Sequence, residues 1–404
     1  MHLISSNRRP TRRRRVLFAV ALAVAAATAS ACGLDFGAGN DFPFDGSVSE
    51  AAPPRDREPP QGTDAAEVET GADANDAAAQ PDTTAVGPPR CPATVLSTPL
   101  VAVVSALRAT MRVSAGSGSM AYVEPSTAAR DAFARTVVAA IGGDEMRACA
   151  LPPSYRVVEL DDPTYGRVRL AAELDARGVP APVLHYGAYA RRVDFTATRA
   201  LVVEAPHPLH DAATDDQAQD LFVRSFARYL LVAGSHRCAS AAESMCSGTT
   251  TSCGARAPFR VSDPAHSTSH PFFAVHGEIL KDPTLVTVQL HGNAAACPQA
   301  LLSDASQVWP TSGFVPTFAN ALEAEGITVG RCGDGYPVAG CDLCGGTNVE
   351  GRFSAGSGDA CTLPGPNGGR FLHLEQLIDL RRREAGAPTW GPVLRALEAS
   401  LPRE

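Results

Sequence analysis

The sequence predicts an α/β protein built on a mostly parallel sheet whose strands alternate with helices. Short apolar runs rich in Val and Leu alternate with segments of helical period, which favours strands joined by crossover helices. Several runs end in polar loops that carry histidine, as expected where ligands bind at the carboxyl edge of such a sheet. Eleven cysteines are present, and the ten beyond Cys32 form an even set that predicts disulfide-braced loops.

The first residues predict an export signal that takes no part in the fold. A basic region with six arginines between Arg8 and Arg15 precedes an apolar stretch, residues 16–27, which is short for a membrane-spanning anchor. Small residues then precede Cys32, which resembles a bacterial lipoprotein cleavage site. We therefore expect a signal peptide over residues 1–31, lipidation of Cys32 and attachment to the cell envelope. The alternative is an ordinary signal peptide cleaved after Ala31.

Two further regions follow the signal peptide. Residues 32–90 are rich in Ala, Pro and Asp and have few large apolar side chains, which predicts a disordered tether. Its acidity accounts for much of the net charge of −8, so the charge indicates no particular partner. Nothing basic beyond the signal peptide suggests nucleic-acid binding. Residues 91–404 are expected to form one folded, hydrolase-like domain.

One βαβ unit organises this domain. Residues 201–203 form an apolar run that stops before His207, which lies between two prolines. Thr214 and Gln217 have the spacing of a capping box and predict the start of a helix. Residues 229–233 predict the next strand, and the loop after it carries His236 and Arg237.

Other elements are predicted on both sides of this unit. Before it we expect a strand or domain edge over residues 99–107, a helix from Ser126 to about residue 141, and strands over residues 155–160 and 183–186. After it we expect helices over residues 271–281, 316–325, 378–384 and 391–401, strands over residues 285–290, 327–329 and 371–377, and a long disulfide-braced loop over residues 330–369. The exported location favours disulfides, although Cys341 and Cys344 have a spacing that would also suit a structural zinc site.

Three polar positions have the residue types of a hydrolytic zinc site. His207 and Asp211 are close in sequence, with His210 as the alternative to Asp211, and His291 ends a later strand. A catalytic zinc needs about three such ligands and a nearby carboxylate to accept a proton from water. Glu375, a carboxylate in an apolar strand, is the predicted base. The competing interpretation is an ion pair between Glu375 and Arg381 or Arg382.

These segments resemble the zinc carboxypeptidase-like amidohydrolases, a group that includes N-formylglutamate amidohydrolases and poly-γ-glutamate hydrolases. The similarity covers about residues 155–383 and lies in the segments 207–211, 289–292, 348–352 and 374–376. It implies a three-layer α/β/α fold, zinc held by His207, Asp211 and His291, water activation by Glu375, and substrate binding by an arginine, Arg237 or Arg352. The family uses His-x-x-Glu, whereas Asp211 comes one residue later, so the choice between His210 and Asp211 stays open.

The expected activity is zinc-dependent hydrolysis of an amide bond in a peptide, an N-acyl amino acid or a cell-wall fragment. The expected partners are thus a peptide-like or N-acyl amino acid substrate and, through the lipid, a membrane. The rival hypothesis is a surface lipoprotein that keeps the fold as a binding module without catalysis.

Overall fold

The computed structural model describes residues 94–96, 99–162, 164–194, 198–293, 296–384 and 387–403. The predicted signal peptide, Cys32 and the predicted tether lie outside these residues. Within them, no helix combines the length and the apolar character needed to cross a membrane.

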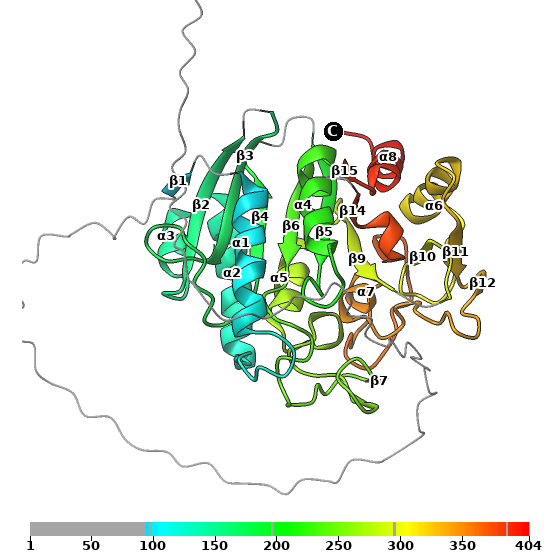
Figure 1. Cartoon of the computed structure of the whole chain (residues 1–404), viewed down its shortest axis with the longest axis horizontal. Helices are drawn as coiled ribbons and strands as arrows, with labels where there is room; N and C mark the ends of the chain where they lie inside the picture. The colour runs from blue at the N-terminus through cyan, green and yellow to red at the C-terminus, as the bar shows by residue number, and fades with distance from the viewer. Residues whose placement is uncertain are drawn as a thin grey trace, which may run out of the picture. The chain divides into compact units, whose positions relative to one another are not determined.

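An eleven-stranded mixed sheet forms the centre of the fold and runs from β1 and β2 at one side to β11 and β12 at the other (Figure 1). In spatial order the strands are β1 (Thr94–Leu96), β2 (Tyr155–Asp162), β3 (Gly166–Glu173), β4 (Ala188–Arg192), β6 (Ala227–Val232), β5 (Arg199–Ala205), β9 (Val286–Gly292), β13 (Phe371–Gln376), β10 (Ala300–Ser303), β11 (Val329–Cys332) and β12 (Gly335–Tyr336). Six neighbouring pairs are parallel and four are antiparallel, so the sheet is mostly parallel, as predicted.

Helices pack on both faces of this sheet. They are α1 (Leu100–Ser114), α2 (Thr127–Gly142), α3 (Glu145–Cys149), α4 (Thr214–Ser225), α5 (Pro271–Ile279), α6 (Phe314–Ala324), α7 (Val349–Ser354) and α8 (Gly391–Ser400). Side chains of α1, α4, α6 and α8 share an apolar core with Leu201 and Val203 of β5, whereas α2 and α5 share a second core with Val202. Because successive strand residues point to opposite faces, β5 separates the two cores. The predicted three-layer α/β/α arrangement is confirmed.

The predicted βαβ unit is present as β5, α4 and β6, and the two strands are parallel. The prediction of a capping box at the start of α4 is wrong, because no side chain caps this helix. Thr214 is the first residue of α4 and its hydroxyl donates to the carbonyl of Asp211 at 2.8 Å. The Gln217 amide donates instead to the side chain of Gln376 on β13 at 2.7 Å. The Thr214 hydroxyl therefore bonds backward to a local carbonyl, and the Gln217 side chain makes a tertiary hydrogen bond in place of a cap.

Four neighbouring strands, β6, β5, β9 and β13, run in the same direction. Their carboxyl ends consequently lie at one edge of the sheet, which gathers the polar loops that follow them. This edge carries His207, His236, His291 and Glu375 from segments as far apart as residues 207 and 375.

Four predicted elements differ in the structure. The loop expected over residues 330–369 also contains most of β11, all of β12 and the helix α7. Residues 99–107 belong to α1, because Leu100, Val103, Val104, Leu107 and Met111 are buried at helical spacing. The strand expected over residues 183–186 begins later, at β4. The helix expected over residues 378–384 is only a single 3₁₀ turn followed by β14 (Arg383–Glu384), which pairs with β15 (Ala387–Pro388).

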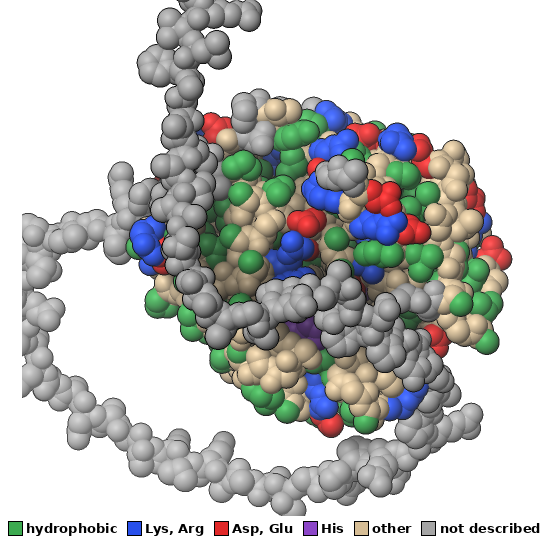
Figure 2. All heavy atoms as spheres, viewed as in Figure 1, with side chains coloured by type: hydrophobic (Ala, Val, Ile, Leu, Met, Phe, Trp, Pro, Cys, Tyr) green, Lys and Arg blue, Asp and Glu red, His purple; other side chains and the backbone are tan. Residues whose placement is uncertain are grey.

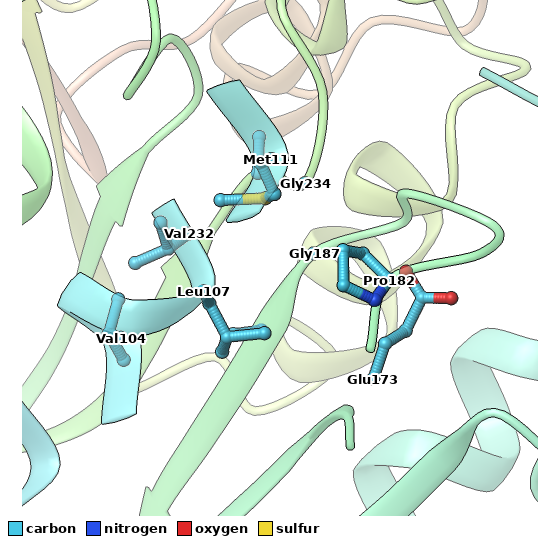
Figure 3. A pocket seen from close by; sticks show the side chains of 10 residues that line it. Val104, Leu107, Met111, Glu173, Pro182, Gly187, Val232 and Gly234 are labelled. Carbon is cyan, nitrogen blue, oxygen red and sulfur yellow. The ribbon is translucent and has the colours of Figure 1, made fainter. Parts of the chain in front are cut away.

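A small cavity lies where α1 packs over the sheet. Figure 3 shows Leu107 and Met111 of α1 at one side and Pro182 with the Glu173 carboxylate at the other. Its volume of about 10 Å³ is room for a single water molecule, so it is a packing gap rather than an organic ligand site.

Four disulfides brace the loops between residues 238 and 361. The pairs are Cys238–Cys253, Cys246–Cys361, Cys297–Cys341 and Cys332–Cys344, and Cys149 is also disulfide-bonded. The first bridge closes a loop that contains β7 (Thr249–Thr250), which pairs with β8 (Ala257–Pro258) just after Cys253. Since Cys341 and Cys344 are both oxidised, the alternative of a structural zinc site there is wrong.

Candidate metal centre

His207 and Asp211 lie on one helical turn directly after β5. The backbone N–H of Asp211 donates to the carbonyl of His207 at 2.7 Å, so the two side chains share one side of the turn. His207 Nδ1 lies 3.4 Å from Asp211 Oδ2. On this turn, the carboxylate of Asp211 reaches the His207 ring although it lies four residues later in the sequence.

His291, near the end of β9, faces the same carboxylate oxygen. Its Nδ1 lies 3.5 Å from Asp211 Oδ2, and its ring centroid lies 5.1 Å from that of His207. All three side chains are buried. They offer ligand atoms within 4.8 Å of one another, so they could hold a metal ion.

Asp263 orients His207 from the opposite side of the ring. Its Oδ1 lies 2.8 Å from His207 Nε2, and its Oδ2 accepts from Arg237 Nε at 2.9 Å and Nη2 at 2.7 Å. Burial alone would raise the pKa of Asp263, but Arg237, His266 and His207 hold it well below its usual value. Burial and the charge of Arg237 would lower the pKa of His207, but Asp263 and Asp211 raise it above its usual value. Because Asp263 occupies Nε2, Nδ1 is the nitrogen that a metal ion would take. Sequence reasoning assigned Asp263 no role.

His373 and Glu375 extend the cluster from β13. Being two residues apart on a strand, they share a face, as predicted, and His373 Nε2 lies 3.6 Å from Glu375 Oε1. Together with His291 they form a second group whose ligand atoms lie within 4.8 Å. Burial, and secondly the Asp211 carboxylate, raise the pKa of Glu375 well above its usual value. Burial likewise lowers the pKa of His373 well below its usual value, so this ring is neutral.

The residues present suit a metal of zinc type. His207 Nδ1, Glu375 Oε2 and His373 Nδ1 are buried atoms without a hydrogen-bond partner in the described part of the chain. Such atoms are costly to bury unless something else satisfies them. The imidazole nitrogens of His207 and His291 and the carboxylate of Asp211 are ligands that zinc accepts. Glu375 lies beside them in the second group.

The structure also places the other predicted site residues. His210 is in neither three-residue group: its ring packs against His236 at 5.4 Å, and burial lowers the pKa of both rings to about 4. Histidine atoms reach the surface beside basic side chains in one area of the face shown in Figure 2. Arg352 donates to the carbonyls of Gly346 at 2.7 Å and Cys361 at 2.9 Å, within the disulfide-braced loops. Substrate binding by Arg237 or Arg352 stays a prediction.

Arg381 adds a buried cation to this edge. Its guanidinium donates to the backbone carbonyls of Gln376 and Ala212. It covers Gly292 so closely that a Cβ there would lie 2.4 Å from its Cζ, which explains the glycine after His291. The charges of Asp211 and Glu375 both act on it.

No family model matches the chain, and no curated protein matches its sequence. Among solved structures, an N-formylglutamate amidohydrolase from Ralstonia eutropha JMP134 is 15% identical, with a TM-score of 0.27, over 50% of this chain and 90% of that one. A metallo-carboxypeptidase from Burkholderia cenocepacia is 12% identical, with a TM-score of 0.30, over 64% of this chain and 67% of that one. These likenesses are too distant to carry an argument about function, which must come from the site itself.

Proposed function

We propose that the chain is a zinc-dependent hydrolase of amide bonds, with the metal held by His207, Asp211 and His291. The observation that carries the proposal is the shared direction of the two imidazoles. Each turns Nδ1 toward the same Asp211 oxygen, while Asp263 and Gln289 lie at 2.8 Å from the two Nε2 atoms. Burying three such groups around one point is unfavourable without a cation.

Glu375 is the proposed proton carrier. When bound, zinc lowers the pKa of a coordinated water and polarises the substrate carbonyl. The high pKa of buried Glu375 makes it a strong base once it is ionised, able to take the proton of the attacking water. The same carboxyl then delivers the proton to the leaving amine, so the amide nitrogen departs uncharged.

The proposed substrate is a peptide, an N-acyl amino acid or a cell-wall fragment met outside the cytoplasm. We propose that the protein is exported and anchored in the cell envelope by lipid on Cys32. Four identified disulfides support an oxidising compartment. The lipid would leave the domain beside the membrane, where envelope fragments are released.

The function is tested first by metal content. The protein, purified with its disulfides intact, is expected to bind about one Zn²⁺ per chain, as three ligands around one point require. His207→Ala and His291→Ala should lose the metal while keeping the circular dichroism of the wild type. A well-folded wild type that takes up no zinc would contradict the proposal and favour the non-catalytic binding module.

The same experiment continues with Glu375→Gln. This variant should retain zinc but lose at least about 100-fold in the rate of amine release from a panel of N-acyl amino acids and short peptides, because the proton carrier is gone. Gln217→Met, a change to a buried amide on α4, serves as the control that keeps turnover. Undiminished turnover in Glu375→Gln would remove Glu375 from the mechanism.

A further inference from the structure

A row of polar side chains crosses the sheet directly below the candidate metal centre. In the register of the parallel strands, Glu204 of β5 pairs with Gln289 of β9, and Gln289 pairs with His373 of β13. His291 and Glu375 form the next pair on the same face, one pleat nearer the edge. Glu204 and Gln289 are completely buried. Polar groups at such depth need defined hydrogen bonds.

The orientation of the Gln289 amide follows from its neighbours. Its Nε2 lies 2.9 Å from Glu204 Oε2 and 3.4 Å from Glu350 Oε2. Only the NH₂ group can face the Glu204 carboxylate, because an amide oxygen there would oppose another acceptor. Gln289 Oε1 must therefore face the other way, toward His291 Nε2 at 2.8 Å.

Asn348 gives an independent check of this orientation. Its Oδ1 accepts the backbone N–H of Gly351 at 2.9 Å and so caps α7. Its NH₂ group is consequently the group that faces Gln289 Oε1. Two separate neighbours thus assign the same atom of Gln289 as the acceptor.

The acceptor determines which nitrogen of His291 carries the proton. Both ring nitrogens face an acceptor, but Gln289 Oε1 lies 2.8 Å from Nε2 whereas Asp211 Oδ2 lies 3.5 Å from Nδ1. The shorter contact places the proton on Nε2 and leaves the lone pair on Nδ1. The alternative tautomer would turn an N–H toward the metal centre and would leave Gln289 facing a lone pair. Gln289 thus favours the single state of His291 that can bind a metal.

Glu204 is itself held in place. His276 of α5 contacts Glu204 Oε1 through Nδ1 at 2.7 Å, and His276 Nε2 meets Ser354 Oγ of α7 at 2.9 Å. Burial, and secondly the charge of Glu204, raise the pKa of Glu350 well above its usual value. Of the two carboxyl groups, Glu204 is also the nearer to Gln289 Nε2, at 2.9 Å against 3.4 Å for Glu350, so Glu204 is the acceptor that holds the Gln289 amide.

We infer that Gln289 is a positioning residue that fixes the tautomer of His291, and that Glu204, held by His276, fixes Gln289. The consequence for metal affinity rests on the proposed function, whereas the tautomer does not. Nothing in the chemistry requires Gln289 to touch a substrate, so its effect is expected through His291 alone.

The test uses two measurements on the full-length protein. Histidine ¹⁵N chemical shifts of the metal-free protein report which imidazole nitrogen is protonated, and competition with a chromophoric chelator gives the Zn²⁺ dissociation constant. Gln289→Met should convert His291 from the Nε2–H form to a mixture of tautomers. It should weaken zinc binding by roughly 10- to 100-fold, as loss of outer hydrogen bonds to a ligand does.

Gln217→Met is the matched control. It removes another fully buried glutamine, whose hydrogen-bond partner is the Gln376 side chain rather than an imidazole. It should cost similar stability and leave the tautomer of His291 and the zinc affinity unchanged. Equal effects of the two variants on His291 would mean that Gln289 acts only through general packing, and would overturn the inference.

A charge swap keeps the test informative if Gln289→Met does not fold. Gln289→Glu alone sets two carboxylates against each other and should weaken zinc binding. The double variant Glu204→Gln with Gln289→Glu restores a donor opposite an acceptor and should recover the tautomer and most of the affinity. Failure of the double variant to recover either would contradict the inference.

The two proposals can fail separately. If the wild type binds no zinc, yet Gln289→Met changes the tautomer of His291 and Gln217→Met does not, the positioning role stands and the hydrolase proposal falls. If zinc binds and both readouts are the same in Gln289→Met as in wild type, the positioning role falls and the hydrolase proposal stands.

Discussion

At the scale of single residues, buried neutral histidines dominate the edge of the sheet. Burial lowers the pKa of His210 and His236 to about 4, and that of His266 and His270 to about 3. An uncharged ring can accept as well as donate, which lets each neighbour decide where the proton sits. The price of this arrangement is sensitivity to acid, because an unfolded chain would take up these protons near pH 6.5.

His270 gives this sensitivity a measurable form. It caps α5, where its Nδ1 accepts the backbone N–H of Phe272 at 3.1 Å, so protonation would destroy the cap. Its folded pKa of about 3 lies below the unfolded value, hence the unfolded state binds more protons and stability falls as the pH drops from 7 toward 3. Between pH 7 and pH 5 this residue alone should cost about 2 kcal/mol.

His270→Asn tests that figure, since asparagine is a good cap that does not titrate. Urea unfolding at pH 7 and at pH 5 should show a loss of stability smaller in the variant than in wild type by about 2 kcal/mol. An identical loss in both proteins would show that His270 is not held neutral by the fold.

At the scale of elements, the sequence pattern predicted a strand correctly where the apolar residues had both the length and the spacing of a buried strand. The runs that became β5, β6, β9 and β13 are apolar and short, and their order predicted a parallel sheet with histidine loops at one edge. The prediction of a strand or domain edge over residues 99–107 was wrong. A Val-rich run after a proline has strand composition, although its buried positions follow the period of a helix.

The candidate site was predictable only in part. The sequence singled out His207, Asp211, His291 and Glu375, and the folded chain brings these side chains into one cluster; whether they bind metal stays a prediction. The role of Asp263 could not be predicted from the sequence. This residue lies in a loop without a repeating pattern and contacts His207 from 56 residues away. Gln289 did carry a usable signal: a polar residue in an apolar strand, on the same face as His291.

Two disulfides that brace the loops beside the site close chain segments of very different length. Cys246–Cys361 joins segments 115 residues apart, whereas Cys238–Cys253 closes a separation of only 15. Removing the longer bridge with Cys246→Ser and Cys361→Ser should cost about 5 kcal/mol, against about 3 kcal/mol for Cys238→Ser with Cys253→Ser. Denaturant unfolding under oxidising conditions measures both. A larger loss from the shorter bridge would mean that native contacts, not chain entropy, set the order.

At the scale of the whole molecule, two apolar cores on opposite faces of one sheet hold the strands whose carboxyl ends carry the candidate metal centre. Lipid on Cys32, as proposed, would determine where the entire chain resides. Full-length protein should sediment with membranes, and Cys32→Ser should move it to the soluble fraction, because a lipid chain supplies apolar area for membrane binding. Unchanged sedimentation, or an unmodified mass for Cys32 in the wild type, would contradict lipidation.

The position of β13 has a consequence for how the protein is made. This strand comes late in the sequence yet lies between β9 and β10, and it brings Glu375 to the edge. Until residue 376 has emerged, β9 lacks one partner and β10 is not joined to the central strands. For the export proposed above, these strand edges would stay unpaired and open to aggregation until residue 376 has followed. Assembly of the cluster is therefore a late event in folding, because Glu375 reaches the edge only when β13 has paired with β9 and β10.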